Sequence, residues 1–269
     1  MPGREPHPSD LGVTLGHAIW AFVEPHVGYE VAFNRWYERD HLIAAGSATP
    51  WALGVQRWVA RPALRALRYP EKNPIADPVT RGIYLGAIWI QEGRIEDQQA
   101  FVSGQLDIFA KHDRNFVHRD VLTTAPYDVA GVVRRDPDGV PPELALERRY
   151  PGLVLTWTER NPGSRFEALC SALMEDVLPA RHAGSPIAMT LAFTPRPKPA
   201  SWPAAIPEVP GVGERILLAS FLDQHPADAW KHFEDLGERI EATGTGRTLL
   251  VAPFEPVVPG EDIPGEELR

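Results

Sequence analysis

Two kinds of hydrophobic pattern alternate along the first half of the chain. Short segments rich in β-branched and aromatic residues indicate strands, whereas longer segments with apolar residues every three or four positions indicate helices. The predicted strands are residues 16–24, 51–60, 82–90 and 121–133, and the predicted helices are residues 29–43 and 95–112. This order, β-α-β-β-α-β, is the ferredoxin-like arrangement.

The second half of the chain repeats this order. Its predicted strands are residues 153–158, 186–194, 216–222 and 247–254, and its predicted helices are residues 164–178 and 226–241. Four landmark pairs lie 137, 135, 136 and 138 residues apart: Trp20 and Trp157, Gly28 and Gly163, Asp40 and Asp176, Gly46 and Gly184. Offsets this similar indicate an internal duplication.

We therefore predict an α+β fold made of two ferredoxin-like (βαββαβ) repeats. Each repeat alone would leave one apolar sheet face without helices, and burying the two faces on each other closes a barrel within one chain. We expect residues 1–15 to form a leader, 16–135 the N-terminal half, 150–254 the C-terminal half and 255–269 a loose tail.

Two proline-rich connections occupy the same place in the two halves, between the second and third predicted strands. They are residues 61–81, which four prolines interrupt, and residues 195–213. A long loop inside a compact domain is often a binding loop or a lid. We expect residues 61–81 to cover the mouth of a pocket in the N-terminal half.

The predicted helix at residues 29–43 combines aromatic and ionisable residues on one face. At helical spacing Tyr37 lies one turn before His41, and Trp36 lies one turn before Asp40. This pattern fits an amphipathic helix whose last turn is stabilised by a histidinium. It also fits a cavity wall on which His41 is a general acid and base and Asp40 or Tyr37 orients it. Because each buried polar tip needs a partner, a purely structural face would be aliphatic, which favours the cavity wall.

Further side chains of the N-terminal half complete this hypothesis. Arg57 shares a strand face with two valines and, like Tyr37, could hydrogen-bond a developing enolate oxygen. The predicted catalytic residues are His41, Asp40, Tyr37 and Arg57. Aromatic side chains supply apolar walls for a ligand. The predicted substrate-binding residues are Trp20, Phe33, Trp36, Trp58 and Tyr84.

This organisation resembles the dimeric α+β barrel superfamily in its fused, tandem form. The topology carries the resemblance over residues 16–254, and the segment FNRWYERDHL, with LRYP downstream, is similar to the W-x3-D-H motif in the first helix of EthD-like members. The resemblance implies a pocket between each sheet and its helices. Members include cofactor-free monooxygenases, lactone isomerases, polyketide cyclases and haem enzymes, so the fold alone does not select an activity.

The C-terminal half departs from this motif. At the positions that correspond to the aromatic and imidazole side chains it carries only apolar residues: Leu169, Ala172, Leu173 and Val177. We expect this half to be mainly structural and the functional pocket to lie in the N-terminal half.

We interpret the chain as a cofactor-independent enzyme of the lyase, isomerase or cyclase type, in which a histidine transfers a proton on a small hydrophobic aromatic or polyketide-like carbonyl compound. A cofactor-free monooxygenase begins with the same proton abstraction, and a non-catalytic protein that binds a hydrophobic metabolite needs the same walls. A haem enzyme, with His41, His112 or His118 as axial ligand, is less favoured. His112 and His118 are six residues apart and do not share a helical face, so we expect no metal site.

Composition limits the partners and the location. A net charge of −9 with scattered acidic residues argues against nucleic-acid and anionic-membrane partners. Cys170 is the only cysteine, which excludes an internal disulfide. We find neither a membrane-spanning apolar run nor a signal-peptide pattern. We expect a cytoplasmic protein whose partner is a small hydrophobic substrate, and the sequence is compatible with a homodimer.

Overall fold

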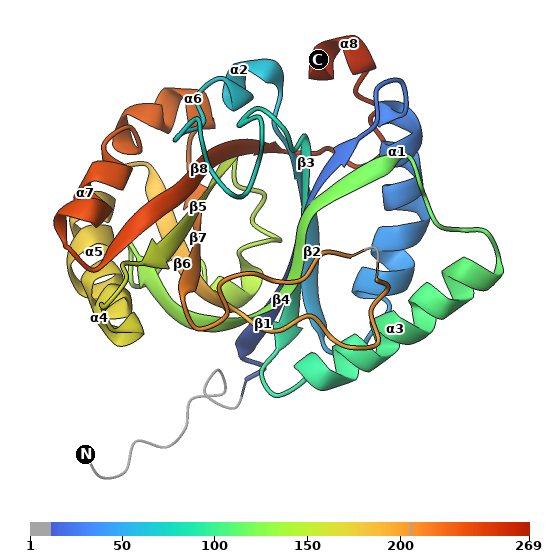
Figure 1. Cartoon of the computed structure of the whole chain (residues 1–269), viewed down its shortest axis with the longest axis horizontal. Coiled ribbons are helices and arrows are strands. Elements are labelled where there is room, and N and C mark those ends of the chain that lie inside the picture. Colours follow the sequence, from blue (N-terminus) through green and yellow to red (C-terminus); the bar gives the residue numbers. More distant parts are fainter. Residues whose placement is uncertain (1–11, 205) are drawn as a thin grey trace.

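Eight antiparallel strands form one closed barrel in this computed structural model, which describes residues 12–204 and 206–269 (Figure 1). Residues 1–11 of the expected leader lie outside the described part. The order around the barrel is β1-β3-β2-β8-β5-β7-β6-β4. The strands are β1 Leu15–Pro25, β2 Ala52–Val59, β3 Tyr84–Gln91, β4 Arg119–Arg134, β5 Gly152–Arg160, β6 Ile187–Pro195, β7 Arg215–Leu222 and β8 Gly246–Pro256.

The barrel consists of two four-stranded halves of equal topology. The N-terminal half has the order β4-β1-β3-β2, and the C-terminal half has the order β8-β5-β7-β6. At one seam β4 pairs with β6 from Tyr127 to Arg134. At the other seam β2 pairs with β8 only at Trp58 and Val59. The predicted fold class, two ferredoxin-like repeats forming a dimeric α+β barrel within one chain, is confirmed.

Helices cover the outside of the barrel, with α1 and α3 on the N-terminal half and α4, α5 and α7 on the C-terminal half (Figure 1). The helical segments are α1 Glu30–Trp36, η2 Tyr37–Ser47, α2 Pro62–Arg65, α3 Ile95–Lys111, η3 Pro142–Leu144, α4 Phe166–Ser171, η4 Ala172–Val177, α5 Leu178–His182, α6 Pro226–Ala229, η5 Trp230–His232, α7 Leu236–Ala242 and α8 Gly265–Leu268. The segments η2 and η4 are π-helical. Since both halves change from α to π at corresponding positions, the π segment belongs to the repeated scaffold.

Strand alternation separates the barrel interior from the layer beneath the helices. On β1, Trp20 and Phe22 belong to the interior cluster, whereas Ile19 and Val23 pack under the helices. The Trp20 ring lies 5.8 Å from the Trp58 ring, centroid to centroid. The largest side chains of this cluster are aromatic: Trp20, Phe22, Trp58, Trp89, Tyr127, Tyr150, Trp157, Phe193, Phe221 and Phe254. The interior is therefore a packed aromatic core.

Each of the two proline-rich connections extends from its own half of the chain onto the other half. The connection after β2 lies against the C-terminal half, where Tyr69 packs on Trp230 and exchanges backbone hydrogen bonds with Val251 of β8. The connection after β6, which we call the strap, lies against the N-terminal half. There Ser201 hydrogen-bonds Ser103 of α3 at 2.7 Å. The later residues of the first connection return to β4, where Arg81 pairs with Asp120 at 2.6 Å. The prediction that residues 61–81 cover the N-terminal pocket is wrong, because none of them lines the cavity of that half.

The chain end is ordered, and the expectation of a loose tail is wrong. Val257, Ile263 and Leu268 are buried beneath α1 in the cluster that contains Phe33. Arg269 pairs with Glu24 at 2.5 Å and with Glu30 at 2.7 Å. Apolar burial and two ion pairs thus attach the tail to the N-terminal half.

Candidate functional site

A small apolar cavity lies between the outer face of the N-terminal sheet and the helices η2 and α3. Its volume is about 90 Å³. Aliphatic side chains of β1, β3 and β4 form its floor, and α3 and the strap close it. The lining residues are Ile19, Ala21, Val23, Trp36, Tyr37, His41, Ala45, Ile88, Val102, Leu106, Arg119, Val121, Thr124, Trp202 and Ile206. Three of the predicted site residues, Trp36, Tyr37 and His41, meet here.

The π-helical turn decides which side chains of the first helix meet. In a π-helix each N–H bonds the carbonyl five residues earlier, as Ala48 N–H does to the Ile43 carbonyl at 3.0 Å. Residues five apart therefore lie above one another. The His41 ring stacks on the Trp36 ring at 4.7 Å between centroids, and it meets the Tyr37 ring edge-on at 5.0 Å.

The His41 imidazole is neutral in this setting. Burial, with a smaller contribution from the neighbouring Arg119, lowers the pKa of His41 to about 3, although Asp40 acts in the opposite direction. Its Nδ1 is buried and makes no hydrogen bond within the described residues. A neutral imidazole with a free nitrogen can accept a proton or hydrogen-bond a ligand.

Tyr37 is wedged between His41 and the sheet. A Cβ placed on Gly86 would lie 2.6 Å from the Tyr37 hydroxyl oxygen, so only glycine leaves room for this hydroxyl. Burial raises the pKa of Tyr37, which keeps the phenol protonated at neutral pH. The hydroxyl is thus a donor on the cavity side of the helix.

Asp40 faces away from the imidazole. Its carboxylate accepts two hydrogen bonds from Arg114, one of them from Nε at 3.0 Å. These hydrogen bonds lower the pKa of Asp40. No hydrogen bond joins Asp40 to His41 among the described residues, so the geometry gives Asp40 the role of anchoring the helix to Arg114.

Arg57 lies on the other side of Tyr37, outside the cavity. Its Nη1 donates to Asn34 at 2.7 Å and to Glu38 at 3.2 Å. Its guanidinium carbon lies 4.6 Å from the centroid of the Tyr37 ring and 4.9 Å from that of Tyr84. Arg57 thus supports Tyr37 from behind by cation–π contacts.

The remaining predicted walls lie elsewhere in the half. Trp20 and Trp58 point into the barrel interior, on the sheet face opposite the cavity. Phe33 and Tyr84 pack with each other at 5.4 Å in the cluster beneath α1. Three of the nine predicted site residues therefore line the cavity. Trp20 and Trp58 lie behind the sheet, and the other four lie outside the lining: Phe33, Asp40, Arg57 and Tyr84.

Sequence reasoning missed Arg119, the cationic group of the cavity. Its guanidinium carbon lies 4.6 Å from the centroid of the Trp36 ring, and it donates to the Phe116 carbonyl. Arg119 precedes the predicted strand by two residues and lines the cavity with Val121. Residues two apart in a strand lie on the same sheet face, so the spacing of Arg119 and Val121 is the sequence signal that could have identified Arg119. Trp202 of the strap was missed because strand patterns do not show where a long connection lies.

The cavity does not fit a haem. An apolar cavity of roughly 150 Å³ takes up one benzene ring, so the 90 Å³ present here cannot enclose a macrocycle. His112 ends α3, and the His118 ring stacks on Tyr29 at 3.8 Å, outside the cavity lining. In the described part, no group of three or more His, Cys, Asp or Glu side chains is placed to hold a metal ion.

Known proteins resemble this chain only in structure. No protein-family model and no curated protein matches the sequence. Two similar solved structures of the dimeric α+β barrel superfamily are an anthrone oxidase-like protein (14% identity, 93% of this chain and 96% of that chain covered, TM-score 0.48) and a monooxygenase-like protein from Fusobacterium nucleatum (9%, 93% and 97%, 0.49). A third similar structure is the encapsulated DyP-type peroxidase from Mycobacterium smegmatis (12%, 94% and 96%, 0.47). With TM-scores below 0.5 and identities of 14% or less, these similarities support no activity for this chain.

None of the helices formed by residues 12–204 and 206–269 has both the length and the apolar character to cross a membrane.

Proposed function

We propose that the chain is a cofactor-independent enzyme that transfers a proton on a small apolar carbonyl compound bound in the cavity. The observation that carries the proposal is the neutral His41 imidazole beside the Arg119 cation in a mainly apolar space. One nitrogen of this imidazole has no partner among the described residues. A base and an oxyanion stabiliser in one water-poor cavity are the minimum for enolate chemistry.

The reaction begins at the carbon next to the carbonyl. Its C–H bond breaks, the proton passes to His41, and the electron pair of that bond moves through the new C=C bond onto the carbonyl oxygen. Arg119 and the Tyr37 hydroxyl hold the resulting negative charge. The enolate in turn raises the proton affinity of His41, because opposite charges favour each other in a low dielectric. Return of the proton at another carbon completes an isomerisation.

The size of the cavity narrows the substrate class. A space of about 90 Å³ is smaller than the roughly 150 Å³ that takes up one benzene ring, so as it stands it accepts only a short branched-chain carbonyl compound. Compounds with a ring, and larger polyketide-like substrates, require the strap residues Trp202 and Ile206 to move outward. The proposal includes a relationship of this chain to EthD-like proteins, which rests on the segment FNRWYERDHL.

A non-catalytic binding protein is the second candidate. A pKa of about 3 makes His41 a weak base while the cavity is empty, and the walls are mainly apolar. In that case the imidazole and Arg119 would only orient a bound carbonyl compound.

Hydrogen–deuterium exchange at the carbon next to the carbonyl separates the two candidates. We would follow acetophenone, cyclohexanone and 1-indanone in D₂O by proton NMR and measure their binding by tryptophan fluorescence. The wild-type chain should accelerate exchange of at least one ketone. His41→Asn, which keeps a hydrogen-bonding group, should lose about 10²–10⁴-fold of this acceleration. His112→Asn, on an exposed residue at the end of α3, is the matched control and should exchange like the wild type.

Arg119→Met tests the second group. It keeps an unbranched side chain over Trp36 but removes the cation, so exchange should slow by about 10²–10³-fold. Ketones that bind without exchange, equally in wild type and His41→Asn, would contradict the enzyme and support the binding protein.

A further inference from the structure

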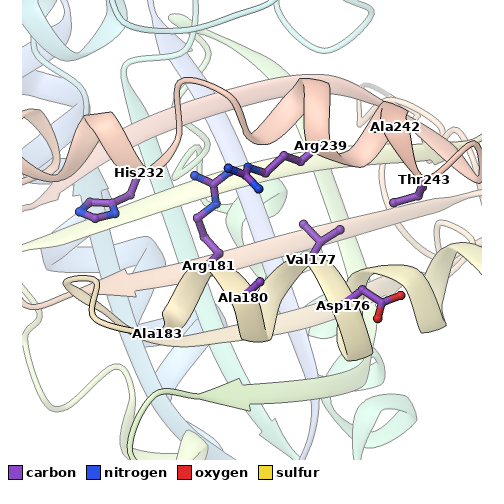
Figure 2. A pocket seen from close by; sticks show the side chains of 9 residues that line it. All are labelled: Asp176, Val177, Ala180, Arg181, Ala183, His232, Arg239, Ala242 and Thr243. Atoms are coloured by element: carbon purple, nitrogen blue, oxygen red, sulfur yellow. The ribbon is translucent and has the colours of Figure 1, made fainter.

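A second, larger groove lies on the C-terminal half, between the helix that runs from η4 into α5 and the helix α7. Its volume is about 480 Å³, within the range of small-molecule sites. Figure 2 shows Arg181, on α5, and Arg239, on α7, pointing toward each other across it. The lining residues are Asp176, Val177, Ala180, Arg181, Ala183, His232, Arg239, Ala242 and Thr243. This groove is far from the chemistry of the N-terminal half and shares no lining residue with the cavity.

The two arginines share one carboxylate. Asp235 lies 2.6 Å from Arg181 Nη2 and accepts a hydrogen bond from Arg239 Nε at 2.7 Å. Two guanidinium charges against one carboxylate leave an excess positive charge at the centre of the groove, in a chain whose net charge is −9.

Most donors of this pair are free. An arginine carries five N–H donors, and within the described residues this pair directs two of them, Nη2 of Arg181 and Nε of Arg239, at Asp235. The Arg181 side chain is only 10% exposed, and Asp235 holds its guanidinium beside the groove. The remaining donors of the two guanidinium groups are available to an acceptor that enters the groove.

The other residues that line the groove indicate which kind of ligand fits it. Val177, Ala180 and Ala242 give the groove an apolar wall next to the arginines. Asp176 lies at one end and disfavours a second negative charge there (Figure 2). At the other end, burial and then the cations Lys231 and Arg181 lower the pKa of His232, so this ring adds a hydrogen-bonding group without charge at neutral pH.

We propose that this groove binds a monocarboxylate with an apolar body. The carboxylate lies between Arg181 and Arg239, which hold it through the planar, forked geometry that guanidinium and carboxylate groups share. The body lies along Val177, Ala180 and Ala242. The C-terminal half, whose predicted role is mainly structural, then carries a ligand site of its own.

Calorimetric titration of the full chain with sodium octanoate tests the site. Octanoate should bind, whereas octanol, which lacks the charge, and acetate, which lacks the body, should each bind at least tenfold more weakly. Arg239→Ala should weaken octanoate binding by about 10–100-fold, the usual worth of a charge-assisted hydrogen bond. Arg239 is 60% exposed, so its removal does not endanger the fold. Arg181→Lys, which keeps the charge without the fork, should weaken binding by a smaller factor.

Arg165→Ala is the matched control, because it removes the same charge from a side chain that is 82% exposed just before α4. It should bind octanoate like the wild type. The proposal is overturned if octanol binds as well as octanoate, if inorganic phosphate binds equally well, or if Arg239→Ala and Arg181→Lys leave octanoate binding unchanged. The ketone assay of the N-terminal cavity is independent of each of these results.

Discussion

His41 stacks on Trp36, five residues before it, with 4.7 Å between ring centroids and 21° between ring planes. In a regular α-helix these positions do not face each other, since neighbours on one face are three or four residues apart. The π-helical segment η2 brings them together. The same segment directs Asp40 toward Arg114. The imidazole is therefore surrounded by aromatic rings and Arg119, and no carboxylate in the described part of the chain hydrogen-bonds it. This environment, more than the residue type, sets the chemistry of His41.

The first prediction is a flat pH dependence of catalysis on the acid side. Because burial lowers the pKa of His41 to about 3, the imidazole remains neutral and able to accept a proton from pH 8 down to about pH 5. An ordinary histidine would lose half of its base form at about pH 6.5. We expect kcat/KM for ketone exchange to change less than twofold over this interval, with the fold monitored by circular dichroism at each pH. A decline centred near pH 6.5 that His41→Asn removes would contradict the buried, neutral imidazole.

The sequence predicted the fold better than the site, for a physical reason. Strand alternation and the repeat near 136 residues depend on local pattern, and they led to the correct barrel. Both faces of these sheets are buried, however, one inside the barrel and one beneath helices. Alternation therefore separates Trp20 from Ile19 but does not say which of them faces the cavity.

The π segment explains a second difference. Helical spacing placed Tyr37 with His41, and the structure keeps that pair. The same spacing predicted that Trp36 would lie next to Asp40. In the structure the π-helical turn contains one extra residue, so His41 lies over Trp36 instead. Tertiary packing decides where the two connections lie. Tyr69 packs against Trp230, and Trp202 packs in the cluster that contains Val102. The pattern of prolines alone could not show it.

The second prediction concerns the glycine beneath Tyr37. Gly86→Ala puts a methyl group 2.6 Å from the Tyr37 hydroxyl, so the ring must shift toward His41. We expect a loss of about 1–3 kcal/mol in the free energy of unfolding, typical of overpacking, and at least tenfold slower ketone exchange. Gly104→Ala on α3 is the matched control, because a Cβ there meets nothing within 4 Å. It should leave exchange unchanged and stabilise the helix by up to about 1 kcal/mol. Equal behaviour of the two variants in both measurements would refute the close contact.

The third prediction concerns the strap. Trp202 is 5% exposed, lines the cavity and leaves its indole N–H without a partner among the described residues. Trp202→Ala removes one wall, so we expect KM for acetophenone to rise about tenfold, equivalent to about 1.4 kcal/mol of binding, while the larger 1-indanone is affected less. Tyr69→Ala is the control, since Tyr69 belongs to the reciprocal connection on the C-terminal half. If Tyr69→Ala raises KM as much as Trp202→Ala does, the effect is a general loss of stability and the strap has no part in the site.

The fourth prediction uses a histidine that belongs to neither the cavity nor the groove. His182 is buried, its Nε2 lies 2.9 Å from Thr190 Oγ1, and Nδ1 has no partner in the described part of the chain. Burial, followed by Arg135, lowers the pKa of His182 to about 4. Well above pH 6.5 both the folded and the unfolded chain hold this imidazole neutral, so there it makes no pH-dependent contribution.

As the pH falls from 6.5 toward 4, the unfolded chain binds a proton at residue 182 that the folded chain does not bind. Stability is therefore lost in this window, by about 2 kcal/mol between pH 7 and pH 4.5 from His182 alone. Urea unfolding of His182→Gln at both pH values should show a pH-dependent loss smaller than that of the wild type by this amount. The slope of free energy against urea should be the same in both proteins, since it reports the surface exposed on unfolding. An identical pH-dependent loss in the two proteins would mean that His182 is protonated in the folded chain, and the buried pair with Thr190 would have to open for that to occur.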